Sequence, residues 1–218
     1  FHPEVFAIGP LVFAYWAART QHWKWFWVMA VLAMSTKEDL TLPFMVLGIL
    51  LIVWGHRKVG ASLLGVALAW YVVVTKVVIG WRNPQGAFYE RVFFGDYGDS
   101  VFGVMFHFVI HPGELWNMAR SGEQISWYLR VLGPLAFVPL LAPDIMAMAI
   151  PMIGVIVISV QNFVRNPTLH YSAVPLAIMM VATVETVARL RSPNHQRAIV
   201  GLVLGACVTS SVFIGISP

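Results

Sequence analysis

The sequence predicts an all-α, polytopic integral membrane protein with about eight transmembrane helices and short interfacial helices in an outer loop. Of its 218 residues, 59% are hydrophobic and only 11% are charged, whereas a typical soluble domain carries about 25% charged residues. The apolar residues gather in runs that short polar connections separate. Several of these connections are basic, as is typical of the cytoplasmic loops of membrane proteins.

Several of the apolar runs are shorter than the ~20 residues that a straight membrane span needs. Because the sequence opens on "FHPEVFAIGP", with neither a starting Met nor a signal-peptide pattern, we expect a longer parent protein. Residues 1–218 would then be a single membrane domain from its C-terminal part. The runs cover residues 4–18, 25–36, 40–55, 60–80, 124–141, 145–160, 171–188 and 198–216.

The charges are distributed unevenly between the two sides that alternating spans would define. The basic connections 19–24, 56–58 and 189–197 fall on one side, which the positive-inside tendency makes cytoplasmic. Eight of the ten carboxylates fall on the other side, either as a solvated rim or as an acidic working surface. We therefore expect a multi-pass protein of the cytoplasmic membrane with acidic loops outside. The outer carboxylates are Glu4, Glu38, Asp39, Glu90, Asp96, Asp99, Glu114 and Glu123.

The longest polar connection, residues 81–123, is expected to be an ordered outer loop. Its first part, "RNPQGAFYERVFFGDYGD" (82–99), is rich in Gly, Asn, Pro and aromatic residues, the composition of a functional loop. Ser100 can cap a short apolar helix over 101–110, and Pro112 can begin a second short helix. Short amphipathic helices of this kind lie in the headgroup layer.

Three adjacent charges, Lys37, Glu38 and Asp39, interrupt an otherwise hydrophobic stretch. Burying a charge at the centre of a membrane helix costs at least about 2.5–3.5 kcal/mol, so such residues face protein or a water-filled cavity. One explanation is structural, with Ser35 or Thr36 capping a helix that begins near Lys37. The other is functional, because two carboxylates and a lysine can hold a divalent cation and a phosphate or position an acceptor hydroxyl.

A second polar cluster, "FHPE" (1–4), is expected to emerge on the same side as Lys37–Asp39. His2 and Glu4 precede an apolar run, and Pro3 suits the first turn of a helix. Ordinary interfacial polarity would also explain this cluster. Two polar clusters on one face, each attached to a membrane helix, indicate a site more strongly than either does alone.

Further candidates lie in the outer connections. Arg165 and His170, in "QNFVRNPTLHY" (161–171), could line the same cavity. His107 and His111 have the i, i+4 spacing of a helical metal pair. No third ligand has a recognisable spacing, and Pro112 follows at once.

Several motifs together resemble a known family, the bacterial and archaeal polytopic membrane proteins called domain of unknown function 2079. The resemblance covers nearly the whole chain, and it implies similarity to the C-type membrane glycosyltransferases, which take a sugar from a polyprenyl-phosphate donor on the outer face. Those enzymes usually place an essential Asp in the first outer loop. The resemblance therefore implies that residues 1–218 are a fragment of a glycosyltransferase-like core without that Asp. The motifs are "FHPE" (1–4), "KED" (37–39), "YGDS" (97–100), "PLAFVPLLAP" (134–143) and "HYSAVP" (170–175).

The functional hypothesis is a glycosyltransferase-like enzyme that uses a polyprenyl-phosphate sugar, and membrane lipid is the second expected partner. The alternative is a non-enzymatic membrane subunit of a larger complex, or a transporter. The basic residues are scattered, so no nucleic-acid partner is expected. A divalent cation, Mg²⁺ or Mn²⁺, would suit Glu38 and Asp39. The expected catalytic residues are Glu38, Asp39 and Glu4, and the expected substrate-binding residues are His2, Lys37, Arg165 and His170.

Overall fold

The computed structural model describes residues 3–82, 93–98, 101–167 and 169–213, and the regular structure within these ranges is helical. The first part of the chain forms helices that short connections separate. These are α1 (Pro3–Arg19), α2 (Trp23–Met34), the 3₁₀ turn η1 (Glu38–Leu40), α3 (Thr41–Val53), α4 (Arg57–Val72), the π-helical segment η2 (Val73–Ile79) and α5 (Gly80–Arg82).

The second part of the chain contains shorter and more irregular elements before two long helices. The helices are α7 (Val101–Ile110), α8 (Pro112–Ala119), α9 (Gly122–Leu132), α10 (Pro143–Met146), α11 (Ile150–Ile158), α12 (Ala173–Arg189) and α13 (Pro193–Phe213). The 3₁₀ segments are η3 (Gly95–Tyr97), η4 (Gly133–Leu135), η5 (Val138–Leu141), η6 (Ala147–Ala149), η7 (Asn162–Arg165) and η8 (His170–Ser172).

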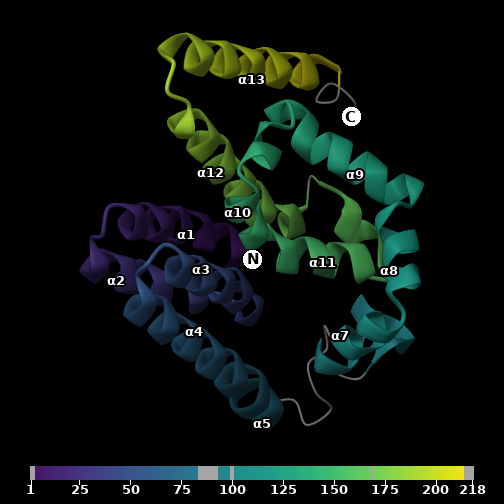
Figure 1. Cartoon of the computed structure of the whole chain (residues 1–218). Helices are drawn as coiled ribbons and strands as arrows, with labels where there is room; N and C mark the ends of the chain where they lie inside the picture. The colour runs from purple at the N-terminus through teal and green to yellow at the C-terminus, as the bar shows by residue number, and fades with distance from the viewer. Residues whose placement is uncertain (1–2, 83–92, 99–100, 168, 214–218) are drawn as a thin grey trace.

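Helices α1–α4 form one packed group, in which α1 packs on α2 and α3 packs on α4 (Figure 1). The α3–α4 contact is close because two glycines face each other across it. A Cβ atom on Gly60 would lie 2.5 Å from the carbonyl oxygen of Gly48 and 2.8 Å from Cγ1 of Ile52. Only residues without a side chain allow the two backbones to approach this closely.

A second apolar core lies among α7, α9 and α11, and α12 contacts helices of both groups. Trp127 of α9 is buried in this core and donates a hydrogen bond from its indole nitrogen to Ser172 Oγ at 3.1 Å. Ser172 directly precedes α12, so this bond ties α9 to the start of the central helix. In Figure 1, α13 lies at the edge of the molecule.

The prediction of about eight transmembrane helices is wrong. In the described part of the chain, only two helices are long and apolar enough to cross a membrane, Arg57–Arg82 with 26 residues and His170–Arg189 with 20. The apolar run 25–36 shows the physical reason, because it gives the 12-residue helix α2. At 1.5 Å per residue such a helix covers about 18 Å, well short of the ~30 Å hydrocarbon core.

The two short helices expected within residues 81–123 are present as α7 and α8, although residues 83–92 and 99–100 of that connection lie outside the described residues. The break between the two helices falls where Pro112 was expected to begin the second one. His111 has the non-helical backbone angles φ −115° and ψ 59°, and Pro112 occupies the first position of α8. Proline is tolerated there because the first amide of a helix has no intrahelical partner.

A network of ion pairs joins the C-terminal ends of α1 and α12. The buried Glu185 accepts a hydrogen bond from the Tyr15 hydroxyl at 2.7 Å and one from Arg19 Nε at 2.8 Å. Arg189 lies one turn further along α12 and forms a bidentate pair with Asp144, at 2.8 and 2.7 Å. Bidentate Arg–carboxylate pairs have a fixed geometry, so the network aligns α1, α10 and α12 at this end.

Candidate functional site

The turn that carries Lys37, Glu38 and Asp39 is formed by the way α2 ends. The hydroxyls of Ser35 and Thr36 both donate hydrogen bonds back to carbonyl groups of α2, those of Leu32 and Ala33, at 2.8 Å. Lys37 has extended backbone angles, and neither hydroxyl caps the following helix. The capping explanation of the charged turn is therefore wrong in its details, because Ser35 and Thr36 complete α2 instead.

Lys37 meets Glu4 in direct contact, as the two sequence clusters predict. Lys37 Nζ donates a hydrogen bond to Glu4 Oε1 at 2.6 Å and forms an ion pair with Asp39 Oδ2 at 3.0 Å. The imidazole of His170 approaches the same Glu4 oxygen to 3.8 Å. We call Glu4, Lys37, Asp39 and His170 the charged cluster; its members come from α1, the η1 turn and η8.

The charged cluster is largely removed from solvent. The Lys37 and Glu4 side chains are only 11% and 6% exposed. Two carboxylate oxygens, Glu4 Oε2 and Asp39 Oδ1, are buried and have no hydrogen-bond partner among the described residues. Buried polar atoms are normally hydrogen-bonded, and an exception in a native protein requires an explanation such as a bound ion, water or ligand.

Burial and neighbouring charges shift the pKa values in the η1 turn. Burial raises the pKa of Glu38, and the negative charge of Asp39 raises it further. Burial also raises the pKa of Asp39, although the Lys37 charge and hydrogen bond oppose this shift. For Lys37, burial disfavours the charged form, but the carboxylates of Asp39 and Glu4 outweigh it and raise the pKa. Lys37 therefore stays charged, while the carboxyls of the turn are poised to accept a proton more readily than free ones.

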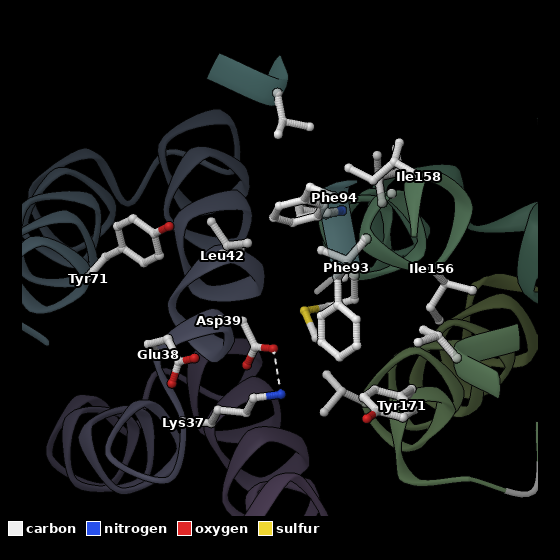
Figure 2. Close-up of a pocket in the computed structure, with 18 of the residues that line it drawn as sticks. Lys37, Glu38, Asp39, Leu42, Tyr71, Phe93, Phe94, Ile156, Ile158 and Tyr171 are labelled. Carbon is white, nitrogen blue, oxygen red and sulfur yellow. Dashed lines mark ion pairs between the residues drawn. The ribbon is translucent and has the colours of Figure 1, made fainter. Parts of the chain in front are cut away.

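The charged cluster and Glu38 lie at the wall of a cavity of about 610 Å³. Figure 2 shows Lys37 and Asp39 with aromatic and branched aliphatic side chains across the cavity from them. These chains come from elements far apart in the sequence, and the cavity thus combines a compact charged region with an extended apolar one. The apolar part includes Leu42, Tyr71, Phe93, Phe94, Ile156 and Tyr171.

The structure brings together most of the predicted site residues. Glu4, Lys37, Glu38, Asp39 and His170 all line the cavity. Within the described part of the chain, the Glu38 carboxylate forms no ion pair, unlike those of Glu4 and Asp39. His2 lies outside the described residues.

Arg165 is not part of the charged cluster, contrary to the expectation that it shares the cavity. Its guanidinium pairs with Glu123 at 3.1 Å and with the Asn162 side chain at 2.8 Å. It also donates to the Ser159 carbonyl at 2.7 Å. Arg165 thus joins η7 to α9 and to the end of α11, because four acceptors, including the Val157 carbonyl at 3.4 Å, surround it where the connection turns.

Glu38 and Asp39, the two predicted metal ligands, both lie at the wall of the cavity. Among the described residues, no third His, Cys, Asp or Glu side chain completes a ligand group with these two. A cation there would therefore need oxygen ligands from water or from a bound molecule, as Mg²⁺ commonly takes them. The unpartnered Asp39 Oδ1 is a suitable hard oxygen donor for such an ion.

The apolar wall of the cavity was not predicted from the sequence. Tyr71 lies in α4, Phe93 and Phe94 lie before η3, and Tyr171 lies in η8. Their spacing in the sequence carries no periodic signal, because three separate segments supply them. The one indication was the aromatic content of residues 82–99. It predicted an ordered loop, but it did not show which helices this loop would face.

The fold and the site define a helical protein with an amphipathic cavity and one charged end. The chain belongs to the family described as predicted membrane protein, domain of unknown function 2079, which matches residues 1–216. This match confirms the resemblance to that family, and it agrees with a membrane location. No curated protein and no solved structure matches the chain.

Proposed function

We propose that the cavity binds a polyprenyl-phosphate sugar and that the charged cluster transfers the sugar to an acceptor hydroxyl. The observation that carries this proposal is the pairing of a buried charged cluster with a long apolar wall in one cavity. A lipid-linked sugar has the same division, with a phosphate and sugar at one end and a hydrocarbon chain at the other. The volume of about 610 Å³ lies within the range of about 300–1,000 Å³ that is usual for ligand sites.

In the proposed reaction, Asp39 acts as the general base. Its carboxylate takes the proton of the acceptor hydroxyl, whose oxygen forms a bond to C1 of the sugar. The C1–O bond to the phosphate breaks, and polyprenyl phosphate leaves with the electron pair. The raised pKa of Asp39 suits this role, because it brings the carboxyl closer to the operating pH.

Lys37 and Glu4 would prepare the phosphate end of the cavity. Lys37 stays charged and would contact the donor phosphate, while Glu4 holds its ammonium group from the other side at 2.6 Å. Three carboxylates, those of Glu4, Glu38 and Asp39, line the cavity beside this one lysine, so a phosphate alone would meet an excess of negative charge. Glu38, together with the donor phosphate, would hold a divalent cation, Mg²⁺ or Mn²⁺. The cation would neutralise that excess and leave the Asp39 carboxylate available as the base.

The two ends of α1 and α12 support a proposal for the orientation of the protein. Glu4 and His170 lie at the N-terminal ends of these helices, and Arg19 and Arg189 lie at their C-terminal ends. We propose that the charged cluster faces the outer side of the cytoplasmic membrane and that the Arg19–Arg189 end faces the cytoplasm. Cytoplasmic loops carry an excess of Lys and Arg, and lipid-linked donors of this class would be used on the outer face.

The proposal is tested with the full-length protein in lipid vesicles that contain synthetic polyprenyl-phosphate hexoses. Release of polyprenyl phosphate measures transfer. The amount of radiolabelled donor that remains bound to the purified protein measures binding. Asp39→Asn should retain binding and lose transfer by about 10²–10⁴-fold, the usual contribution of a general base. Lys37→Met should lose binding, whereas Lys58→Met, at an exposed position on α4, should change neither.

The outcomes separate the two functional classes. Donor binding without release, for every hexose and acceptor supplied, would favour a non-enzymatic lipid-binding subunit over an enzyme. Absence of donor binding would contradict the assignment of the cavity itself.

A further inference from the structure

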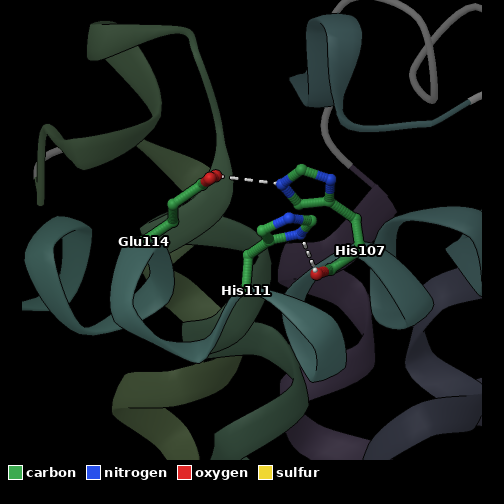
Figure 3. A group of neighbouring side chains, drawn as sticks. All are labelled: His107, His111 and Glu114. Atoms are coloured by element: carbon green, nitrogen blue, oxygen red, sulfur yellow. Dashed lines mark hydrogen bonds and ion pairs between the residues drawn. The ribbon is translucent and has the colours of Figure 1, made fainter.

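We infer that His107, His111 and Glu114 form a binding site for a transition-metal ion, with Zn²⁺ as the best fit. This site is separate from the charged cluster, and it does not depend on the proposed transferase activity. Within the described residues these are the three His, Cys, Asp or Glu side chains that could hold an ion together. One ligand atom from each lies within 4.8 Å of the other two (Figure 3).

The local fold brings the three side chains together. His107 and His111 are one helical turn apart, and their rings stack with centroids 4.6 Å apart. The backbone turns at His111, and Pro112 begins α8. Glu114 then falls in the first turn of α8, and its Oε2 lies 2.9 Å from His107 Nε2.

The hydrogen bonding of His111 favours metal binding through its Nε2 atom. His111 Nδ1 lies 3.1 Å from the backbone carbonyl of His107. A carbonyl oxygen only accepts hydrogen bonds, so this contact requires the proton on Nδ1 and leaves the lone pair of a neutral ring on Nε2. Metal-binding histidines nearly always donate a hydrogen bond from the other ring nitrogen to such an acceptor.

The distances suit an ion that binds nitrogen and oxygen at about 2.0–2.2 Å. Two ligands of one such ion lie no more than about 4 Å apart, which is slightly less than the 4.8 Å within which these three atoms lie. Small rotations of the side chains would therefore complete the site. The freedom to rotate is available, because the His107 and Glu114 side chains are 27% and 50% exposed. The proton that His107 Nε2 shares with Glu114 Oε2 would be released to solvent, and the ion would take its place as the two atoms separate slightly.

The ligand set selects the type of metal. Two imidazoles and a carboxylate favour Zn²⁺ and related transition metals, whereas Mg²⁺ and Ca²⁺ prefer oxygen ligands alone. Three protein ligands leave the fourth position of a tetrahedral ion to water. A bound ion would also join α7 to α8, which supply Val104, Phe108 and Leu115 to the cavity wall.

The test is a calorimetric titration of ZnCl₂ into the untagged full-length protein, stripped of metal and held in detergent. We expect one Zn²⁺ per chain at this site, and any heat from MgCl₂ should be the same for the wild type and for His111→Ala. Loss of an outer-shell partner already weakens metal binding by about 10–100-fold. His111→Ala and Glu114→Gln, which remove direct ligands, should therefore each weaken Zn²⁺ binding at least tenfold.

His195→Ala is the matched control, because His195 is exposed on α13. It should leave zinc affinity unchanged. Zinc should also raise the Tm of the wild-type protein and of His195→Ala, but not that of His111→Ala, whose Tm without zinc reports whether it folds. Equal weakening in the control, or a wild-type protein whose Tm zinc leaves unchanged, would overturn the site and leave only a His107–Glu114 ion pair.

Discussion

Lys37 is held between two carboxylates in a region with little solvent access. Removing one partner of a buried ion pair leaves an uncompensated charge, which typically destabilises a protein by about 3–5 kcal/mol. We therefore expect Lys37→Met to lower the free energy of unfolding by about that amount, measured by urea titration in detergent micelles. The exposed Lys58→Met should change it by less than about 0.5 kcal/mol.

A double variant identifies the cause of the Lys37→Met effect. Adding Glu4→Gln removes one of the two carboxylate charges that Lys37→Met leaves without a partner, so part of the lost stability should return. If the double variant is as unstable as the sum of the two single ones, packing rather than charge pairing explains the loss.

Replacing Glu38 is expected to stabilise the protein, whereas replacing Lys37 is expected to destabilise it. Because burial and then Asp39 raise its pKa above the ordinary value of 4.5, the folded state opposes its ionisation. This opposition is absent below pH 4.5, grows as the pH rises, and is complete only above the raised pKa. Glu38→Gln should therefore have a higher Tm than the wild type at neutral pH, with the difference disappearing in acid.

Asp144 is the matched comparison for Glu38. The hydrogen bonds from Arg189 hold the pKa of Asp144 below its ordinary value, despite some burial. Its ionised form therefore stabilises the folded state above the ordinary value of 3.8, and this stability is lost as the pH falls through the lowered pKa. Asp144→Asn should lower the Tm at neutral pH. A lower Tm for Glu38→Gln as well would mean that the Glu38 carboxylate has a stabilising partner.

At the residue scale, the contact between the two charged clusters could be predicted from the sequence, because their charges are costly to bury and both clusters were expected on the same side. Charges at Lys37–Asp39 and Glu4 are too costly for lipid, and the structure places Lys37 and Glu4 in contact. Glu114 could have been found as well, since it lies three residues after His111, within reach of a turn at that point. Pro112 indicated the end of a helix, but the chain turns there only briefly, since α7 ends at Ile110 and α8 begins at Pro112 itself.

At the element scale, the α3–α4 contact determines how closely two walls of the cavity approach, because α3 carries Leu42 and α4 carries Tyr71. Gly60→Ala would place a Cβ atom 2.5 Å from the Gly48 carbonyl oxygen, so one helix must shift. Overpacking of this kind costs about 1–3 kcal/mol. Thermal unfolding followed by circular dichroism in detergent should show the lower stability.

Gly65→Ala is the control on the same helix. A Cβ atom at Gly65 meets nothing within 4 Å, and alanine is favoured over glycine inside a helix by about 0.5–1 kcal/mol. Gly65→Ala should therefore be as stable as the wild type or more stable. Equal stability of the two variants would mean that α3 and α4 separate without cost.

The number of membrane spans could not be obtained from apolar runs alone. Run 40–55 is apolar throughout, but the helix α3 covers only 13 residues, Thr41–Val53. The chain turns at Gly55, whose φ of +92° favours glycine. Turns at such points convert apolar runs into short helices that pack on one another, a tertiary outcome that periodicity does not report.

At the scale of the whole molecule, α1 and α12 carry chemically different groups at their two ends. The N-terminal ends meet at Glu4 and His170, and the C-terminal ends meet at Arg19 and Glu185. A helix of 17 residues, the length of both α1 and α12, separates its ends by about 25 Å. The contact between α1 and α12 therefore holds the ion-pair network and the charged cluster at opposite ends of one packed pair of helices.

The orientation of these two ends is open to direct measurement. Single cysteines are introduced into a Cys207→Ser background at exposed positions near each end, Ser35 and Asn166 near the charged cluster and Lys24 and Asn194 near Arg19 and Arg189. If the charged cluster faces outward, a membrane-impermeant maleimide added to intact cells should label the first pair. The second pair should react only after the membrane is opened, because the proposed orientation puts the basic end in the cytoplasm, as the positive-inside tendency favours. Labelling of all four positions in intact cells would contradict the proposed orientation.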